Sequence, residues 1–276
     1  MEHANHRHHR TVADLIADRT RREGHRPLLT YYDDMTGART ELSYATLDNW
    51  AAKTANMLAE EYDVGAGATV ALDLDGHWTA VAIMLACWKL GAVPRPQPTP
   101  NGEHQFSPMT GEAALVCCHE RRVERYPNGP VLVVGDGLAT EPVTDVPTRD
   151  GLLLFGAEVH AFADEYDGEV GPTTPASATD DHASLLARAA AWRAALGDGP
   201  RVGLAAPADH PRAVDLLAGV LLAHGSLVVE RPATGRPRWD RWSTERVSVV
   251  VGPDPDTADA PAEVTRLGFD TVPSPA

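Results

Sequence analysis

The sequence predicts an α/β fold: two related lobes of mostly parallel sheet with covering helices. Three observations support this fold. Apolar strands alternate with helical segments along most of the 276 residues, an order typical of parallel sheets covered by helices. Hydrophobic residues make up 43% of the chain, enough for a sizeable core. Finally, one unit occurs twice: helix, paired glycines, strand, histidine, apolar helix, glycine, strand.

This repeated unit sets the expected domain organisation. His77 lies fourteen positions before Gly91, and His210 lies fifteen positions before Gly225, each pair enclosing an apolar helix. The two copies indicate two similar helix–strand–helix–strand lobes. We expect a disordered His-rich tail at 1–10, a first lobe at 11–163, a linker at 164–179, a second lobe at 180–252 and a poorly ordered tail at 253–276.

Local signals place the elements of the first lobe. The turn sequence Asp-Met-Thr-Gly between residues 28–33 and 39–44 predicts a β-hairpin. Ser43 is a helix-capping residue, and apolar residues follow it at three- and four-residue spacing, so a long amphipathic helix is expected. The other expected elements are a helix at 11–22, a strand at 69–74, a helix at 77–90, an extended segment at 92–96, strands at 113–118 and 131–135 with a short helix between them, and a strand within 151–162.

The second lobe follows the same pattern. Asp180 or Asp181 caps its first helix, and Gly197 and Gly199 end it. The expected elements are a helix from the cap to 196, strands at 201–206 and 226–230, a helix at 210–223, a helix at 237–245 that buries Trp239 and Trp242, and a final strand at 247–251.

Composition argues against several classes of function. The net charge of −15 disfavours nucleic acid and anionic membranes, because both need clustered basic residues. The most apolar stretch, 214–229, contains Asp215 and His224 and is too short to span a bilayer. Three cysteines without a Cys-x-x-Cys pair indicate neither a disulfide framework nor a zinc site. Residues 1–10 lack the apolar region of a signal peptide, so a cytoplasmic location is expected.

Residues 41–96 resemble a known family. The run from Glu41 to Leu58, followed by Gly65-Ala-Gly67 and an apolar strand, resembles the opening of adenylate-forming enzymes, the AMP-binding, acyl-CoA synthetase-like superfamily. The block Trp88 to Pro96 resembles the family motif Lys-x-Gly-Ala-x-x-x-Pro. Most of residues 11–251 follow the N-terminal part of that family in order, as in a short actinobacterial group of proteins that align only with the front half.

The resemblance implies a phosphate-cradling loop, Thr-Ser-Gly-Thr-Thr-Gly-x-Pro-Lys in the family. Here the corresponding segment is Val-Gly-Pro-Thr-Thr-Pro-Ala-Ser-Ala-Thr, residues 170–179. Gly171, Thr173 and Thr174 are therefore the candidate nucleotide-binding residues of a degenerate loop.

Prolines and missing lysines weaken that loop. Pro172 and Pro175 each remove a backbone N–H donor, so we expect an open, exposed segment without converging N–H groups. No lysine follows the loop, Lys53 and Lys89 lie in the first lobe, and Arg188 and Arg193 lie in the next helix, away from the loop position.

These features predict a catalytically inactive relative, a pseudoenzyme with a binding or regulatory role, acting with an unknown protein partner or by self-association. No cofactor, metal or catalytic residue is expected. The family's later motifs and C-terminal domain have no counterpart in the sequence. The alternative is half of a split ATP-dependent acid–thiol ligase, using ATP or AMP and Mg²⁺, that a partner chain completes.

The sequence does not assign a role to several other polar residues. His77 and His210 begin the two apolar helices and either face a shared cleft or are ordinary helix-start groups. Asp73, Asp75 and His77 lie near a strand end, where α/β proteins place their sites, but no Gly-x-Ser-x-Gly motif accompanies them.

Overall fold

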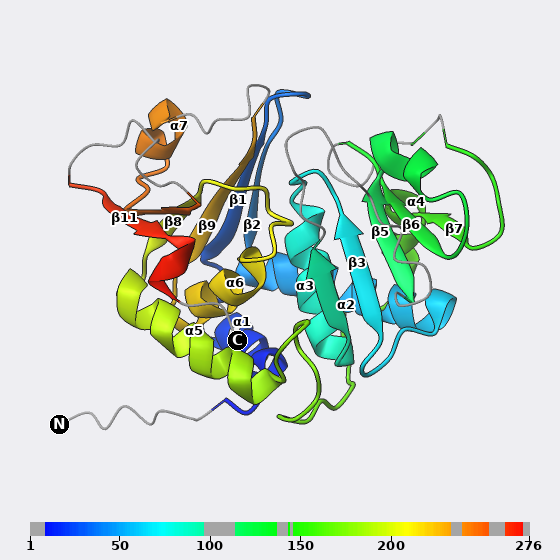
Figure 1. Ribbon diagram of the computed structural model, residues 1–276, viewed down its shortest axis with the longest axis horizontal. Helices are drawn as coiled ribbons and strands as arrows, with labels where there is room; N and C mark the ends of the chain where they lie inside the picture. The colour runs from blue at the N-terminus through cyan, green and yellow to red at the C-terminus, as the bar shows by residue number, and fades with distance from the viewer. Residues whose placement is uncertain are drawn as a thin grey trace.

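The computed structural model describes residues 9–96, 114–136, 143, 146–232, 239–253 and 263–272. Two sheets lie side by side, each with helices packed on it (Figure 1). The first sheet is all parallel, in the order β4 (Val93–Pro96), β3 (Thr69–Asp73), β5 (Leu115–His119), β6 (Val131–Val134) and β7 (Leu152–Leu154).

The second sheet contains six strands and is parallel except for one hairpin. Its order is β11 (Thr265–Gly268), β10 (Val249–Gly252), β8 (Arg201–Leu204), β9 (Ser226–Arg231), β1 (Pro27–Asp33) and β2 (Arg39–Ser43), with β1 and β2 antiparallel. The predicted α/β class with mostly parallel sheets is confirmed.

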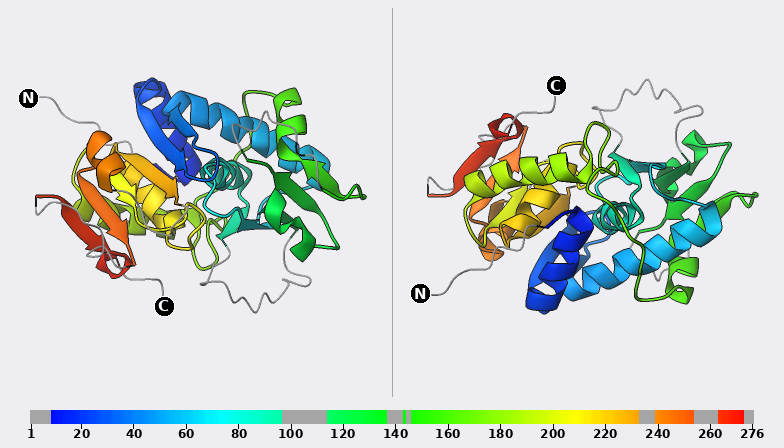
Figure 2. Two further views of the ribbon diagram at one scale, coloured as in Figure 1. Left: turned by 90° about the horizontal axis from the view of Figure 1, so that it is seen from above. Right: turned by 90° about the horizontal axis from the view of Figure 1, so that it is seen from below.

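The helices pack in pairs beside the sheets. The longer ones are α1 (Val12–Glu23), α2 (Tyr44–Tyr62), α3 (Thr79–Leu90), α5 (His182–Leu196) and α6 (Ala213–Leu222). The short ones are α4 (Phe155–Glu158), α7 (Trp239–Thr244), η1 (Glu120–Arg125), η2 (Val159–Ala161) and η4 (Phe269–Thr271). Figure 2 shows the yellow-to-red strands and the green strands at opposite ends of the molecule, with α3 between them. No helix in the described residues is both long and apolar enough to cross a bilayer.

The two lobes share one topology. The segments α2–β3–α3–β4 and α5–β8–α6–β9 have the same order of elements. Their strands occupy equivalent places, since β4-β3-β5-β6 in the first sheet matches β9-β8-β10-β11 in the second. The internal repeat in the sequence therefore corresponds to a repeated fold.

Two segments differ from the sequence expectation. The hairpin of β1 and β2 is expected in the first lobe, yet β1 pairs in parallel with β9 of the second sheet. Its apolar residues Leu28, Leu29 and Tyr31 are buried there. The second sheet also extends past residue 252, because β11 pairs with β10, so the expectation of a poorly ordered tail is wrong for residues 263–272. Most of the expected tail at 1–10 lies outside the described residues.

Side-chain caps explain where the helices begin. Thr11 and Asp14 form a reciprocal capping box at the start of α1, and the Ser43 hydroxyl accepts the Thr46 N–H at the start of α2. Gly91 ends α3 with φ of 70°, a left-handed conformation that glycine adopts without strain. The predicted cap at Ser43 is thus confirmed.

The core of the second lobe depends on a glycine beneath a tryptophan. Trp192 on α5 is fully buried, and its indole N–H donates to Asp215 on α6 at 2.9 Å. A Cβ on Gly219 would overlap the Trp192 Cβ and lie 3.0 Å from its Cγ. The two helices therefore approach closely only because residue 219 has no side chain.

Gly219→Ala should lower the free energy of unfolding by about 1–3 kcal/mol, because overpacking outweighs the higher helix propensity of alanine. Urea denaturation measures the change. Gly65→Ala is the matched control, since no atom lies within 4 Å of its added Cβ, and it should change stability by less than about 0.5 kcal/mol. Equal effects of the two substitutions would contradict the close packing.

Candidate functional site

The segment predicted to be the degenerate phosphate loop is closed on itself. The Thr174 N–H donates to the Gly171 carbonyl at 3.1 Å, forming a turn with Pro172 in its second position. The first N–H groups of α5 donate back into this turn, from His182 to the Thr174 carbonyl at 3.1 Å and from Ala183 to the Pro172 carbonyl at 2.9 Å. These N–H groups, which would face an anion at a helix N-terminus, are already used.

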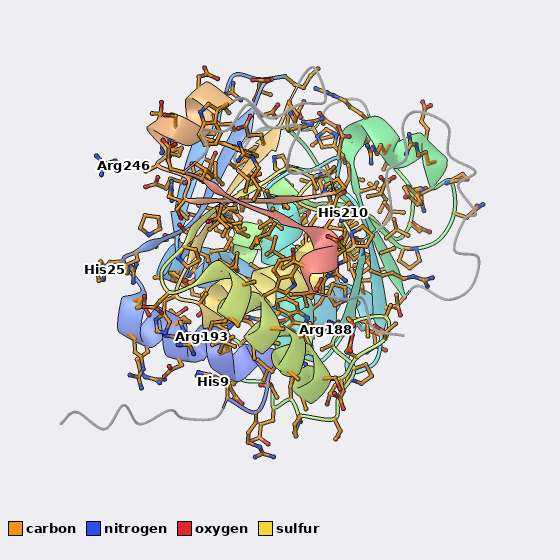
Figure 3. All side chains as sticks on the ribbon, turned by 60° about the vertical axis from the view of Figure 1, so that its left-hand side comes forward. His9, His25, Arg188, Arg193, His210 and Arg246 are labelled. Carbon is orange, nitrogen blue, oxygen red and sulfur yellow. The ribbon has the colours of Figure 1, made fainter. Side chains whose placement is uncertain are left out.

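The second half of the loop is held by Asp180. Its carbonyl accepts the N–H groups of Ala176 at 2.8 Å and Ser177 at 3.0 Å. Burial opposes ionisation of its carboxyl, but hydrogen bonds from Arg188, Ser177 and Thr179 keep the pKa of Asp180 below its usual value. Arg188 on α5, labelled in Figure 3, therefore pairs with Asp180 of the loop, contrary to the sequence expectation.

The loop also packs against the end of α3. The indole N–H of Trp88 donates to the Ala176 carbonyl at 2.8 Å. The Thr174 methyl carbon lies 2.9 Å from where a Cβ on Gly91 would be. Gly171 and Thr173 are exposed, and Thr174 is half-buried. The expected absence of converging N–H groups agrees with this geometry, whereas the expected open segment does not.

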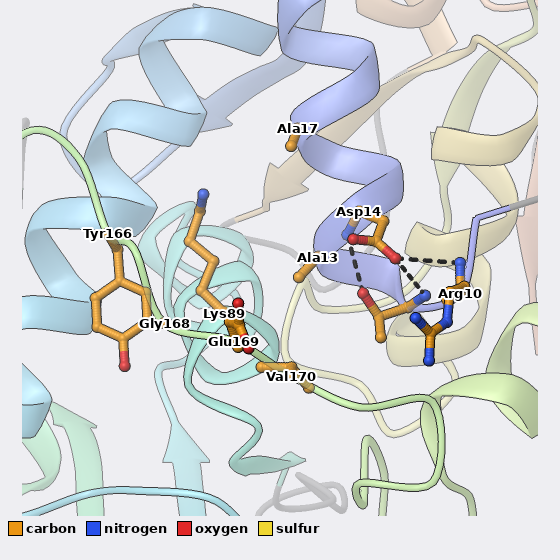
Figure 4. A pocket seen from close by; sticks show the side chains of 10 residues that line it. Arg10, Ala13, Asp14, Ala17, Lys89, Tyr166, Gly168, Glu169 and Val170 are labelled. Atoms are coloured by element: carbon orange, nitrogen blue, oxygen red, sulfur yellow. Dashed lines mark hydrogen bonds between the residues drawn. The ribbon is translucent and has the colours of Figure 1, made fainter. Parts of the chain in front are cut away.

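Of the two lysines, only Lys53 holds the chain that leads into the loop. Lys53 donates to the Phe162 carbonyl at 2.6 Å and pairs with Asp164 at 2.5 Å. Lys89 lines a cavity of about 430 Å³ between α1 and residues 166–170 (Figure 4). Its ammonium is 2.7 Å from the Asp48 carboxylate, so its charge is paired on α2 and not directed at the loop.

A second group of polar residues lies where α/β proteins place ligand sites, at the carboxyl ends of the parallel strands. Arg231 ends β9 of the second sheet and donates to Asp136 at 2.7 Å, Asp75 at 2.8 Å and Asp33 at 3.3 Å. Asp75 and Asp136 follow strands β3 and β6 of the first sheet. We call this cluster, with His119 at the end of β5, the junction, because it connects the two sheets.

Arginines on η1 extend the junction along the first sheet. Arg122 bonds Asp73 and Asp75, and the Tyr126 hydroxyl donates to Asp73 at 2.8 Å. Asp73 is 4% exposed and Arg231 is 5% exposed. The carboxyl ends of the strands are therefore filled by ion pairs of the protein itself.

The group His119, Glu120 and Asp136 has metal-ligand composition, with ligand atoms within 4.8 Å of one another. His119 Nδ1 accepts the Arg121 N–H at 3.3 Å, so the proton resides on Nε2, which donates to Asp136 at 2.9 Å. Arg231 and Arg121 also bond Asp136. Because its imidazole lone pair and carboxylate are already engaged with donors, this group suits an arginine network better than a divalent cation.

The two predicted histidines have different neighbours. His77 is fully buried and contacts the rings of Tyr31 at 5.3 Å and His119 at 6.2 Å between centroids. The ring of His210 stacks on Phe269 at 4.6 Å, and burial lowers its pKa. Of the residues near the first strand end, Asp73 and Asp75 share Arg122.

The residue before His210 makes the contact between the lobes that the sequence analysis missed. The Asp209 carboxylate accepts the N–H of Leu74 at 2.7 Å and that of Gly76 at 2.9 Å, and both belong to the turn after β3. Arg231, Asp136 and His119 were missed as well. Each lies at or just after the carboxyl end of an expected strand, a signal that the sequence contains.

Comparisons with known proteins agree with this architecture. A family model described as AMP-binding enzyme matches residues 16–126. Acyl-CoA synthetase from Brucella canis superposes with a TM-score of 0.67 at 19% identity, over 87% of this chain and 47% of that protein. The N-terminal domain of FACL13 from Mycobacterium tuberculosis superposes with a TM-score of 0.69 at 16% identity, over 94% of this chain and 69% of that one.

The fold is thus that of the N-terminal domain of adenylate-forming enzymes, and this chain spans about half of the length of the Brucella synthetase. A TIGR03089 family protein of Mycobacterium tuberculosis (strain ATCC 25618 / H37Rv) is 30% identical over 234 residues, which cover 82% of this chain and 91% of that protein. The chain belongs to the TIGR03089 family.

Arg231→Met should lower the free energy of unfolding by about 3–5 kcal/mol, because it leaves the buried Asp33 and the half-buried Asp75 and Asp136 without their shared cation. Chemical denaturation measures this change. Arg21→Met is the control, since Arg21 is 60% exposed in its pair with Asp18, and it should cost less than about 1 kcal/mol. A small effect at Arg231 would mean that water and the other arginines bond the carboxylates of the junction once Arg231 is replaced.

Proposed function

We propose that this chain is a non-catalytic relative of the adenylate-forming enzymes with a binding or regulatory role. The observation that carries the proposal is the segment at 171–182. Its turn and the start of α5 use their N–H groups internally, and prolines replace two donors. An ATP phosphate placed there would meet few free N–H groups and no lysine.

The junction supports the same proposal. In a nucleotide-binding α/β protein, the carboxyl ends of the strands stay accessible to the ligand. Here Arg231 joins Asp75 and Asp136 across that position, and the ion pairs would have to break before a ligand could enter. Arg231 also pairs with the buried Asp33, and breaking a buried pair costs several kcal/mol, roughly the free energy of millimolar binding (about 4 kcal/mol).

The alternative is half of a split ligase that a partner chain completes with ATP and Mg²⁺. This reading requires the segment at 171–182 to bind phosphate. A measurement of nucleotide binding and of ATP–pyrophosphate exchange therefore distinguishes the split ligase from the non-catalytic relative.

The purified protein should catalyse no carboxylate-dependent exchange between ATP and pyrophosphate, and millimolar Mg-ATP should leave its melting temperature unchanged. Binding at a hundred times the dissociation constant would add about 2.7 kcal/mol of stability, which a thermal-shift assay detects readily. Exchange, or a saturable shift that is lost in Thr173→Ala/Thr174→Ala, would contradict the proposal and favour the split ligase. Thr179→Ala is the control for the double variant, because its hydroxyl bonds only within the segment, to Asp180.

A further inference from the structure

We propose that the outer edge of β2 is an interface with a second copy of this chain, in which the two β2 strands pair antiparallel with Thr40 at the twofold axis. The proposal does not rest on the proposed function, because it uses no residue of the segment at 171–182 or of the junction.

The ladder between β1 and β2 decides which backbone groups face this edge. Among the described strands, β2 is the last in the second sheet, with β1 on one side only. The Asp33 N–H donates to the Ala38 carbonyl at 3.0 Å, and hydrogen-bonded pairs recur at every second residue of an antiparallel ladder, so the next such pair is Tyr31 with Thr40. The N–H and C=O groups of Arg39 and Glu41 therefore point away from β1.

Outward-pointing groups of this kind form a template for another strand. When two β2 strands run antiparallel about Thr40, Arg39 of each copy lies opposite Glu41 of the other. These are the residues whose backbone groups face outward, so each of the two pairs exchanges its N–H and C=O groups as a hydrogen-bonded pair. The same patch is used on both copies, which is the closed symmetry of most homodimers.

The charges match in the same register. The Arg39 side chain is 45% exposed and that of Glu41 is 39% exposed. Within the described residues, Arg39 bonds through Nε and Nη2 and Glu41 through Oε2, so Arg39 Nη1 and Glu41 Oε1 have capacity for a partner. Opposite charges that face each other across an antiparallel pair stabilise it by about 0.2–1 kcal/mol.

Other registers lose this match. Charged residues usually protect a sheet edge from pairing. Sliding one strand by two residues places Glu41 opposite Glu41 in one direction and Arg39 opposite Arg39 in the other, and like charges directly opposite are destabilising. The order Arg-Thr-Glu thus makes the edge complementary to itself in one register.

An exposed apolar side chain lies at the end of the same edge. Met35, in the turn between β1 and β2, is 54% exposed and is the one exposed large hydrophobic residue in the described part of the chain. In the proposed register the turn of one copy approaches the start of α2 in the other, where Ala45 is exposed. One strand edge and a turn bury less area than a stable dimer needs, so the association should be weak and concentration-dependent.

Sedimentation velocity of the whole protein over a range of concentrations tests the interface. The unmodified protein should shift from monomer to dimer as its concentration rises. Arg39→Glu and Glu41→Arg should each stay monomeric at the concentration where the unmodified protein is half dimeric, because like charges then lie opposite each other. The double variant Arg39→Glu/Glu41→Arg should dimerise again, and an equimolar mixture of the two single variants should form a heterodimer.

The charge of the whole protein provides an internal control. At a net charge of −15, Arg39→Glu increases general repulsion between copies and Glu41→Arg decreases it, so only a specific contact is lost in both. Glu158→Arg on α4 makes the same charge change as Glu41→Arg at an exposed position of the first lobe, and it should leave the dimer unchanged. A monomer at every concentration, or dimers that persist in both single variants, would overturn the proposal.

A second measurement covers the case in which a charge swap does not fold, since Arg39 also bonds Glu245. Amide hydrogen exchange of the unmodified protein, resolved by residue, is followed at low and at high concentration. Exchange at the Arg39 and Glu41 amides should slow in proportion to the dimer fraction, whereas the Thr40 amide, which faces β1, should be protected at both. Equal exchange at Arg39 and Glu41 at the two concentrations would also overturn the proposal.

Discussion

The contact on which the arrangement of this protein depends is a buried carboxylate between two loops. Asp209 of the second lobe holds the left-handed turn after β3 through two backbone N–H groups. Without an acceptor, these N–H groups would be buried and unpaired, which costs about 1–3 kcal/mol for each. This turn places the Asp75 carboxylate in contact with Arg122 and Arg231. One hydrogen-bonded carboxylate thus orients the ion pairs that join the two sheets.

The ion pairs at the junction connect the two sheets of a fold that this chain shares with adenylate-forming enzymes. Parallel strands from both lobes end at one place, where such folds bind ligands. In this chain that place is occupied by aspartates and arginines that bond each other, and His119 contributes its N–H to the same network. Burial is the main reason that the pKa of His119 is lowered, with Arg231 adding to the effect, so the ring stays neutral near pH 7. The network therefore holds the two lobes in one relative position and fills the place where an open crevice would lie.

The segment at 171–182 uses its N–H groups in hydrogen bonds of its own, which is not the geometry of an anion site. A cradle requires N–H groups that point outward from a loop and a helix N-terminus. Pro172 starts a turn whose carbonyl groups accept the first N–H groups of α5, and Asp180, fixed by Arg188, closes the second half. Trp88 and Gly91 of α3 then provide the surface on which the loop packs. Pro172 and Pro175 have no N–H group, and the N–H groups of Thr174, His182 and Ala183 bond carbonyl groups of the same segment.

The sequence by itself determined the α/β class, the order of most helices and strands, and the internal repeat, because periodicity, caps and glycines act over a few residues. Ser43, Gly91 and the two apolar helices after His77 and His210 needed no knowledge of distant contacts. The tertiary structure alone decided that the hairpin of β1 and β2 joins the second sheet and that β11 extends it, since pairing partners depend on which buried edges meet. It also decided the junction: Asp75 and Asp136 follow strands of the first sheet, Arg231 ends a strand of the second, and only the packing of the two lobes brings their charges together.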